Sequence, residues 1–128
     1  MKIYFAHPVS HYNTEYEKKC LEMISVCFPK AEIVNPNAEY HQEAYKKYGM
    51  AHFKRYVESC DAVVFSSFLD GEVGMGVFTE LMTMVEKNGF IFEVDGEVGV
   101  TVVPLSTVFA IRPLSILQTR DRNKDKQL

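Results

Sequence analysis

The chain has 128 residues, which suits one domain of ordinary size and is too short for two separate hydrophobic cores. Hydrophobic residues make up 47% of the chain, and this fraction excludes intrinsic disorder as its main state. The formal net charge of -3 excludes a general attraction to nucleic acid, and no apolar run approaches the roughly 20 residues that span a bilayer. The first residues also lack the pattern of a secretion signal. We therefore expect a cytoplasmic globular protein with neither a nucleic-acid nor a membrane partner.

The first half of the chain alternates short β-rich runs with amphipathic segments. The apolar and aromatic residues of 2–6 predict a strand, which ends at His7-Pro8 because proline cannot donate to a ladder. A capping box at Thr14–Glu17 predicts the start of a helix that stops before Pro29. Two further elements follow, namely a strand over 31–34 and a helix over 39–59 that is broken near Gly49.

The second half begins with a continuous apolar run. Residues 61–65 place four apolar residues after one acid, which is typical of a central strand covered on both faces. A loop over 66–74 leads to a helix over 75–87, which Asn88-Gly89 closes. The other elements that we expect are a strand over 90–94, a fifth strand over 108–111, a short helix over 115–120 and a frayed charged segment over 121–126.

This order of elements predicts the fold class. Helices that alternate with buried apolar strands indicate an α/β fold with a three-layer, mostly parallel, doubly wound (Rossmann-like) sheet of about five strands in a single domain. We place the domain at 1–120 and a charged C-terminal tail at 121–128. The pentapeptide Asp-Gly-Glu-Val-Gly occurs at 70–74 and again at 95–99, and we interpret it as a turn composition without functional weight.

In open sheets of this kind, ligands bind beyond the carboxyl ends of the strands. The loop after the central strand is rich in glycine and leads into the helix that carries Glu80. The sequence therefore predicts a carboxylate beside a crevice lined by Gly74 and Gly76. Because the amino-terminal end of a helix favours negative charge, we expect the ionised form of Glu80, which suits a nucleophile better than a general acid.

The sequence lacks the motifs of the common cofactors. Gly74-x-Gly76 has no third glycine of the dinucleotide fingerprint, and no Gly-Lys-Ser/Thr of a phosphate-binding loop is present. No two histidines lie at i, i+4 within a predicted helix, and the three cysteines lack a C-x-x-C spacing. We therefore expect neither an organic cofactor nor a bound metal.

Three short motifs together resemble a known superfamily. They are Ile3-Tyr4-Phe5-Ala6, Cys60-Asp61-Ala62-Val63-Val64 and Gly74-Met75-Gly76-Val77-Phe78-Thr79-Glu80-Leu81. In combination they look like the motifs of the nucleoside 2-deoxyribosyltransferases and of the related 2'-deoxynucleoside 5'-phosphate N-hydrolases, over residues 2–94. The resemblance implies an enzyme that cleaves or transfers the N-glycosidic bond of a (deoxy)nucleoside or nucleoside monophosphate.

The resemblance also implies roles for single residues. The glutamate at the position of Glu80 attacks C1' of the deoxyribose, and the tyrosine that matches Tyr4 orients this glutamate. A second base, or water in the hydrolases, then resolves the glycosyl-enzyme. The chemistry is reasonable because a carboxylate can stabilise and capture an oxocarbenium-like centre, as in retaining glycosidases.

The chain departs from the family pattern in two places. The aspartate that helps to protonate the leaving base is missing from residues 51–54, where His52 is the candidate proton donor. Gly74 stands where the transferases have a base-binding aspartate and the hydrolases have a phosphate-binding serine. Glu72, two residues earlier, is the candidate replacement for that aspartate.

Other loop residues complete the expected substrate-binding set. His7 follows the first strand, where the family places residues near the base or sugar, and Ser66 follows the central strand. The acids of residues 70–72 would repel a phosphate, which favours a nucleoside, although Arg112 would offset part of this repulsion.

Two alternative functions stay open. The missing aspartate also fits a catalytically inactive nucleotide-binding or sensor module. In addition, Gly74-x-Gly76-Val77-x-x-Glu80 resembles the Gly-x-Gly-Thr-x-x-Glu element of the cytokinin-riboside phosphoribohydrolases, which act on ribonucleotides. Because the transferase family forms dimers or larger assemblies, the resemblance implies a homodimer or higher homo-oligomer, with residues 115–120 as a segment that reaches a neighbouring site.

Overall fold

The structure, a computed structural model, describes residues 1–124 apart from the side chains of residues 39, 40, 42 and 50. Its centre is a five-stranded sheet in the order β2-β1-β3-β4-β5. The first four strands of this order are parallel, and β5 is antiparallel to β4. The strands are β1 (Lys2–Ala6), β2 (Glu32–Val34), β3 (Ala62–Phe65), β4 (Phe90–Asp95) and β5 (Gly99–Val102).

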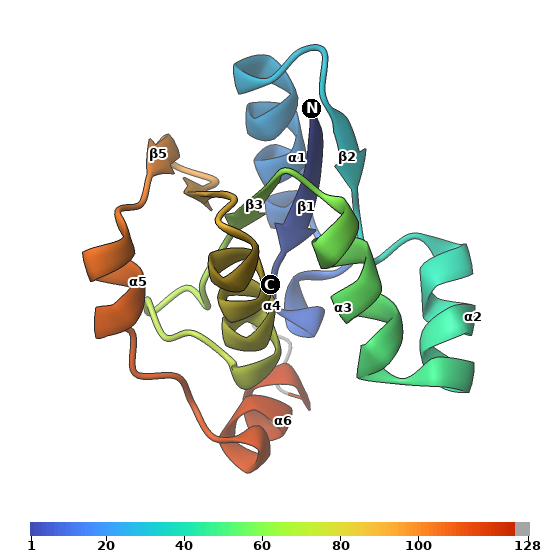
Figure 1. Cartoon of the computed structure of the whole chain (residues 1–128). Coiled ribbons are helices and arrows are strands. Elements are labelled where there is room, and N and C mark those ends of the chain that lie inside the picture. Colours follow the sequence, from blue (N-terminus) through green and yellow to red (C-terminus); the bar gives the residue numbers. More distant parts are fainter. Residues whose placement is uncertain (125–128) are drawn as a thin grey trace.

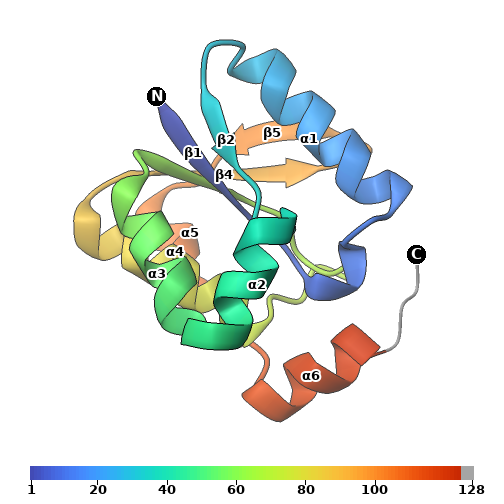
Figure 2. The same ribbon diagram turned by 90° about the vertical axis from the view of Figure 1, so that its right-hand side faces the viewer.

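Helices cover both faces of the sheet, so the predicted three-layer α/β fold is confirmed (Figure 1). The α1 helix packs on one face, and α3 and α4 pack on the other, as Figure 2 shows. The helices are α1 (Glu15–Cys27), α2 (Glu39–Tyr48), α3 (Met50–Ser59), α4 (Met75–Lys87), α5 (Leu105–Ala110) and α6 (Ile116–Lys124), with a short 3-10 helix η1 (Val9–His11).

Alternation along the central strands explains why these apolar runs are buried on both faces. In β1, Ile3 and Phe5 join the core cluster beneath α1, whereas Tyr4 and Ala6 join the cluster beneath α3 and α4. Successive side chains of a strand point to opposite faces, and all four of these residues are fully buried. Tyr4 is thereby directed toward α4, the helix that carries Glu80.

Local signals place most helix ends as the sequence predicts. Thr14 is the N-cap of α1 and accepts a hydrogen bond from the backbone N–H of Glu17 at 3.2 Å. Gly49 has a φ of 66° and separates α2 from α3, which confirms the predicted break. Asn88 adopts the left-handed conformation that closes α4.

The predicted fifth strand over 108–111 is wrong. Residues 105–110 form α5, and the fifth strand is β5, which follows β4 through a tight turn. In that turn the carboxylate of Asp95 accepts a hydrogen bond from the backbone N–H of Glu97 at 2.8 Å. The carboxylate of Asp70 accepts one from the N–H of Glu72 at 3.1 Å in the first copy of the pentapeptide, so both copies form the same Asx turn.

The end of the chain also differs from the prediction. The α6 helix runs from Ile116 to Lys124, so the expected boundary at 120 falls inside a helix, and residues 121–124 are helical instead of frayed. The rest of the expected tail, residues 125–128, lies outside the described residues. None of the helices in the described part of the chain combines the length and the apolar character that a membrane span requires.

Candidate functional site

A cavity of about 200 Å³ lies where β1 ends and α4 begins. The strand order reverses between β1 and β3, and ligands of open α/β sheets bind at such a switch point. Five aromatic side chains make up much of the wall: Tyr4, Tyr12, Tyr45, Phe53 and Phe68. The polar side chains of the wall are His7, Glu80, Thr119 and Asn123. Aromatic walls with a few polar groups are typical of small-molecule sites.

Glu80 lies on the second turn of α4 and is only 8% exposed. Burial raises the pKa of its carboxyl to about 8, and the neighbouring Tyr4 offsets only part of this rise. The carboxyl is therefore mainly protonated at neutral pH, which corrects the expectation of an ionised side chain. The helix dipole acts within the first turn, and Glu80 lies beyond it, so the loss of solvent dominates.

Tyr4 supplies an unused hydroxyl at the floor of the cavity. Its side chain is fully buried, and burial raises its pKa well above the ordinary value, with the negative charge of Glu80 as the next cause. The hydroxyl lies close enough to the Glu80 carboxyl to lower the pKa of that group, but the two do not reach hydrogen-bonding geometry. Tyr4 Oη thus has no hydrogen-bond partner among the described residues, and a ligand in the cavity can supply one.

His7 reaches the cavity with both ring nitrogens engaged. Its Nδ1 lies 3.0 Å from the carbonyl oxygen of Phe5, and its Nε2 lies 2.7 Å from Oε2 of Glu17. Glu17 also accepts hydrogen bonds from the backbone N–H of Asn13 and from the Asn37 amide. These donors hold the pKa of Glu17 below its ordinary value despite burial. The pair therefore fixes one wall of the cavity.

Sequence analysis did not identify Glu17 or Tyr12 as site residues. Glu17 matches the last position of a capping box, and its carboxylate turns instead toward His7. Tyr12 follows η1, where no periodic pattern marks it. Burial raises the pKa of Tyr12, followed by the charges of Glu80 and Glu17, and its side chain lines the cavity together with Glu80. Only the fold brings these residues together.

Gly74 and Gly76 line the cavity for different structural reasons. A Cβ on Gly74 would lie 2.9 Å from Cγ2 of Thr119, so this glycine permits α6 to approach α4. A Cβ on Gly76 would meet nothing within 4 Å, and this glycine leaves the cavity open. Both line the cavity as expected, but only Gly76 does so by leaving space.

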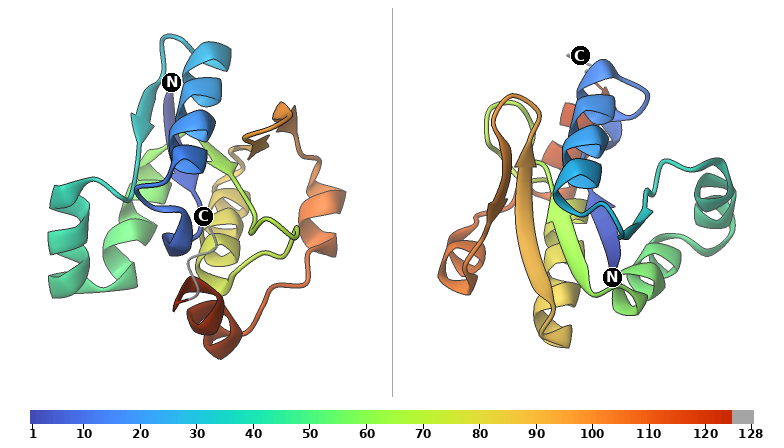
Figure 3. Two further views of the ribbon diagram at one scale, coloured as in Figure 1. Left: turned by 180° about the vertical axis from the view of Figure 1, so that it is seen from behind. Right: turned by 90° about the horizontal axis from the view of Figure 1, so that it is seen from above.

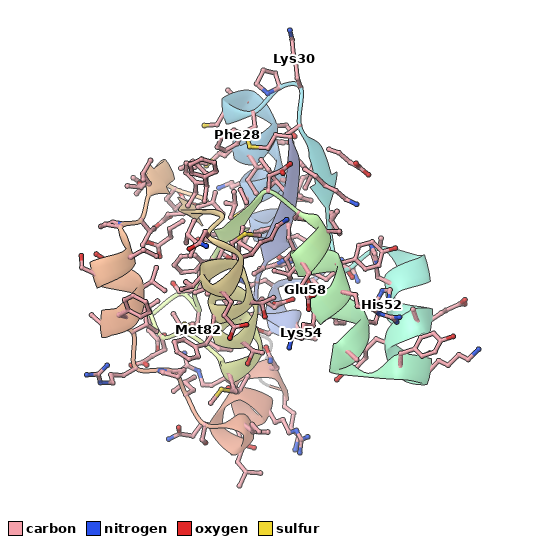
Figure 4. The ribbon with its side chains drawn as sticks, in the orientation of Figure 1. Phe28, Lys30, His52, Lys54, Glu58 and Met82 are labelled. Carbon is pink, nitrogen blue, oxygen red and sulfur yellow. The ribbon has the colours of Figure 1, made fainter. Side chains whose placement is uncertain are left out.

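Three expected site residues lie elsewhere. His52 does not line the cavity; its Nε2 lies 2.9 Å from Nδ1 of His41, on the side of α3 that faces α2 (Figure 4). Ser66 is buried, its hydroxyl has no hydrogen-bond partner among the described residues, and it is also absent from the cavity wall. Glu72 is exposed in the Asx turn with Asp70. The structure therefore does not bring these three residues to Glu80.

The α6 helix closes the cavity of its own chain, although the resemblance implied that 115–120 reach a neighbour. Figure 3 shows α6 beside the amino-terminal end of α4. Thr119 Oγ1 accepts a hydrogen bond from the N–H of Met75 at 2.9 Å, and Asn123 Oδ1 accepts one from the N–H of Ser10 at 3.0 Å. Arg122 forms an ion pair with Asp70 at 2.7 Å. Three polar contacts thus hold this wall in place.

A capping box at Ser115–Gln118 marks the start of α6, which agrees with the expected helix over 115–120. The Ser115 hydroxyl accepts from the N–H of Gln118 at 3.1 Å, and the Gln118 side chain accepts from the N–H of Ser115 at 2.9 Å. No sequence signal, however, shows that Thr119 and Asn123 face a cavity.

Among the described residues, no cluster of three or more histidine, cysteine or acidic side chains is suited to hold a metal ion. The sequence matches no model of a known protein family, and no curated protein is significantly similar to it. The site must therefore be interpreted from its own geometry.

Proposed function

We propose that this protein is an enzyme that cleaves or transfers the N-glycosidic bond of a (deoxy)nucleoside or nucleoside monophosphate through Glu80. The observation that carries the proposal is the meeting of the Glu80 carboxyl and the unpartnered Tyr4 hydroxyl inside an aromatic-walled cavity. Aromatic rings bind a planar base by stacking, and a carboxylate captures an oxocarbenium-like carbon.

In this proposal the ionised Glu80 forms a bond to C1' while the bond between C1' and the base breaks. The base leaves with the electron pair of that bond and takes up a proton from water. Water or a second base then attacks C1', the bond from C1' to Glu80 breaks with its electron pair returning to the carboxylate, and the attacking group gives a proton back to solvent. Since Glu80 must first lose its own proton, the rate depends on how readily the carboxyl ionises.

The charge of the wall favours a neutral nucleoside over a monophosphate. No lysine or arginine is among the described residues that line the cavity. Arg122 is engaged with Asp70, and Arg112 is exposed after α5 without lining the cavity. A phosphate would therefore lack the charge-assisted partners that it needs when it leaves water.

A second candidate function is ligand binding without turnover. Glu80 is the only carboxylic acid among the described residues of the wall, so no second acid is in place to protonate a leaving base. This observation favours a nucleoside-binding or sensor module if the bond is not cleaved.

Incubation with a panel of deoxynucleosides and their monophosphates, with and without a second base, separates the two functions. The enzyme is supported if wild type releases or exchanges the base and Glu80→Gln does not. Binding of a nucleoside without any release supports the module. If the protein neither binds nor cleaves any member of the panel, the proposal fails.

The homo-oligomer also stays a proposal. Three large apolar side chains of β4, β5 and α5 are exposed by more than half, namely Phe90 at 65%, Val102 at 69% and Phe109 at 56%. Such side chains would be covered in an interface. A monomeric mass in sedimentation at micromolar concentration would contradict an oligomer.

A further inference from the structure

Glu80 is reached from two sides. Besides the main cavity, a second hollow of about 130 Å³ lies between α3 and α4, and its lining consists of Ala51, Lys54, Thr79 and Glu80. Glu80 therefore lines both hollows. We call the hollow between the two helices the α3–α4 seam.

The seam continues to the surface of the protein. Lys54 also lines the next hollow along the two helices, together with Glu58, Thr83, Glu86 and Lys87. Figure 4 shows Lys54 and Glu58 on the side of α3 that faces α4. Since Lys54 is shared by both hollows, its flexible side chain lies between Glu80 and bulk solvent.

Small residues keep the seam open. Ala51 contributes only a methyl group, and the hydroxyl of Thr79 bonds back to the carbonyl oxygen of Met75 at 2.8 Å. Thr83 likewise bonds back to the carbonyl of Thr79 at 2.9 Å. These side chains lie along their own helix and leave the space between the helices unfilled.

The charges around Glu80 differ on its two sides. On the cavity side Glu80 shares the wall with Tyr4 and Tyr12, and the basic group of that wall, His7, is held by Glu17. On the seam side, Lys54 is the only lysine or arginine among the described residues that line either hollow next to Glu80. No ion pair joins Lys54 to Glu80 in this structure, and Lys54 is exposed.

We propose that the α3–α4 seam is the route by which Glu80 exchanges its proton with solvent when a ligand fills the main cavity, and that Lys54 moves into the seam as the counter-ion of the ionised carboxylate. The proton passes from the carboxyl oxygen to water in the seam, while Lys54 keeps its own proton throughout. The catalytic use of this route rests on the proposed function, but the pairing of Lys54 with Glu80 does not.

The first experiment therefore needs no turnover. Carboxyl-carbon NMR of glutamate-labelled protein follows the titration of Glu80, which Glu80→Gln identifies by loss of its signal. We expect Lys54→Met to raise the pKa of Glu80 by about half a unit to one unit, because the ionised form loses its counter-ion. Lys18→Met removes the same charge from the exposed face of α1 and should leave the titration unchanged. Equal pKa values in wild type and Lys54→Met would overturn the role of Lys54.

The second experiment tests the route itself. Ala51→Leu fills the seam without touching the main cavity, and Ala51→Ser leaves it open to water. For release of adenine from 2'-deoxyadenosine below pH 8, we expect kcat to fall about 3- to 10-fold in Ala51→Leu with KM unchanged, and to stay near wild type in Ala51→Ser. Equal kcat values in all three proteins would overturn the route. If the wild type releases no base from any nucleoside, the proposed function fails, and the NMR titration still decides the pairing.

Discussion

The cavity has two walls that are held in place by different forces. The inner wall consists of Tyr4 from β1 and Glu80 from α4, and both elements are packed into the hydrophobic core beneath α3 and α4. The outer wall is α6, which has no buried residue. Two of its side chains accept hydrogen bonds from backbone N–H groups, and Arg122 forms an ion pair with Asp70 and lies over the Phe68 ring at 4.8 Å. The chemical groups thus belong to the rigid part of the molecule, and the closing element belongs to its weakly held part.

This difference predicts how the two walls respond to change. Loss of a group from the inner wall should affect chemistry and protonation strongly, because those groups are buried and cannot be replaced by water. Loss of a contact from the outer wall should cost little stability, because exposed polar contacts contribute little. If substitutions in the outer wall had larger effects than substitutions in the inner wall, the two walls would not be distinct.

The largest effect is expected for Glu80→Gln. The amide keeps the shape of the side chain but cannot form the bond to C1', so we expect release of the base to fall by about 10³-fold or more. Tyr4→Phe removes only the hydroxyl beside the carboxyl, and we expect the rate of base release to fall by roughly 10-fold. Chromatography of the released base measures both rates, and a Glu80→Gln protein as fast as wild type would exclude Glu80 as the nucleophile.

The same substitution should change the pH dependence of stability. Between an ordinary pKa of 4.5 and a folded value of about 8, the folded state keeps the Glu80 proton and the unfolded state loses it. The proton on Glu80 therefore stabilises the folded wild type fully below pH 4.5, and this stabilisation is lost as pH rises through the window. We compare the free energies of unfolding of Glu80→Gln and wild type. The difference should shift in favour of Glu80→Gln by about 3–5 kcal/mol between pH 4.5 and pH 9, since one pKa unit is worth about 1.4 kcal/mol.

Urea denaturation at these two pH values measures the gain. Other titrating groups are common to both proteins and cancel in the difference. A difference that stays constant with pH would mean that the Glu80 carboxyl is not buried as the structure describes.

A smaller effect is expected where the two walls meet. Gly74→Ala places a Cβ 2.9 Å from Thr119 Cγ2, so we expect a loss of about 1 kcal/mol and a shift of α6. Gly76→Ala is the matched control, because its Cβ meets nothing within 4 Å and alanine favours the helix. Thermal unfolding compares the two proteins. Addition of Thr119→Ser, which removes Cγ2, should restore Gly74→Ala; no rescue would mean that the steric contact is not the cause.

The smallest effect is expected for Arg122→Gln. The ion pair with Asp70 is partly exposed, so its loss should lower the free energy of unfolding by only about 0.2–1 kcal/mol. Hydrogen exchange of the α6 amides should rise nevertheless, while exchange in α4 stays unchanged. If the α6 amides of Arg122→Gln exchange at the same rate as in wild type, this ion pair does not hold α6.

The core of the fold could be predicted because its signals are local. The apolar runs of β1 and β3, the Thr14 cap and the left-handed Gly49 each act within a few residues, and the structure confirms them. The fifth strand is predicted at 108–111 instead of at 99–102, because apolar residues alone do not show which strand they pair with. The Asx turn at Asp95 brings residues 99–102 back along β4 instead.

The site could be predicted only in part, for a related reason. Glu80, Tyr4 and the two glycines lie on elements whose positions the strand order fixes, and all of them line the cavity. Tyr12, Glu17 and Asn123 reach the site through contacts between distant segments, which leave no spacing in the sequence. The protonation of Glu80 was predicted wrongly because burial, unlike helix position, depends on the whole fold.

A nucleophilic Glu80 must be ionised, so the pH dependence of base release identifies its role. With the deoxynucleoside that the wild type cleaves fastest, we expect kcat/KM to rise with pH and to level off above a pKa of about 8 in the free enzyme. A value of kcat/KM that falls as pH rises through 8 would mean that Glu80 donates a proton and is not the nucleophile.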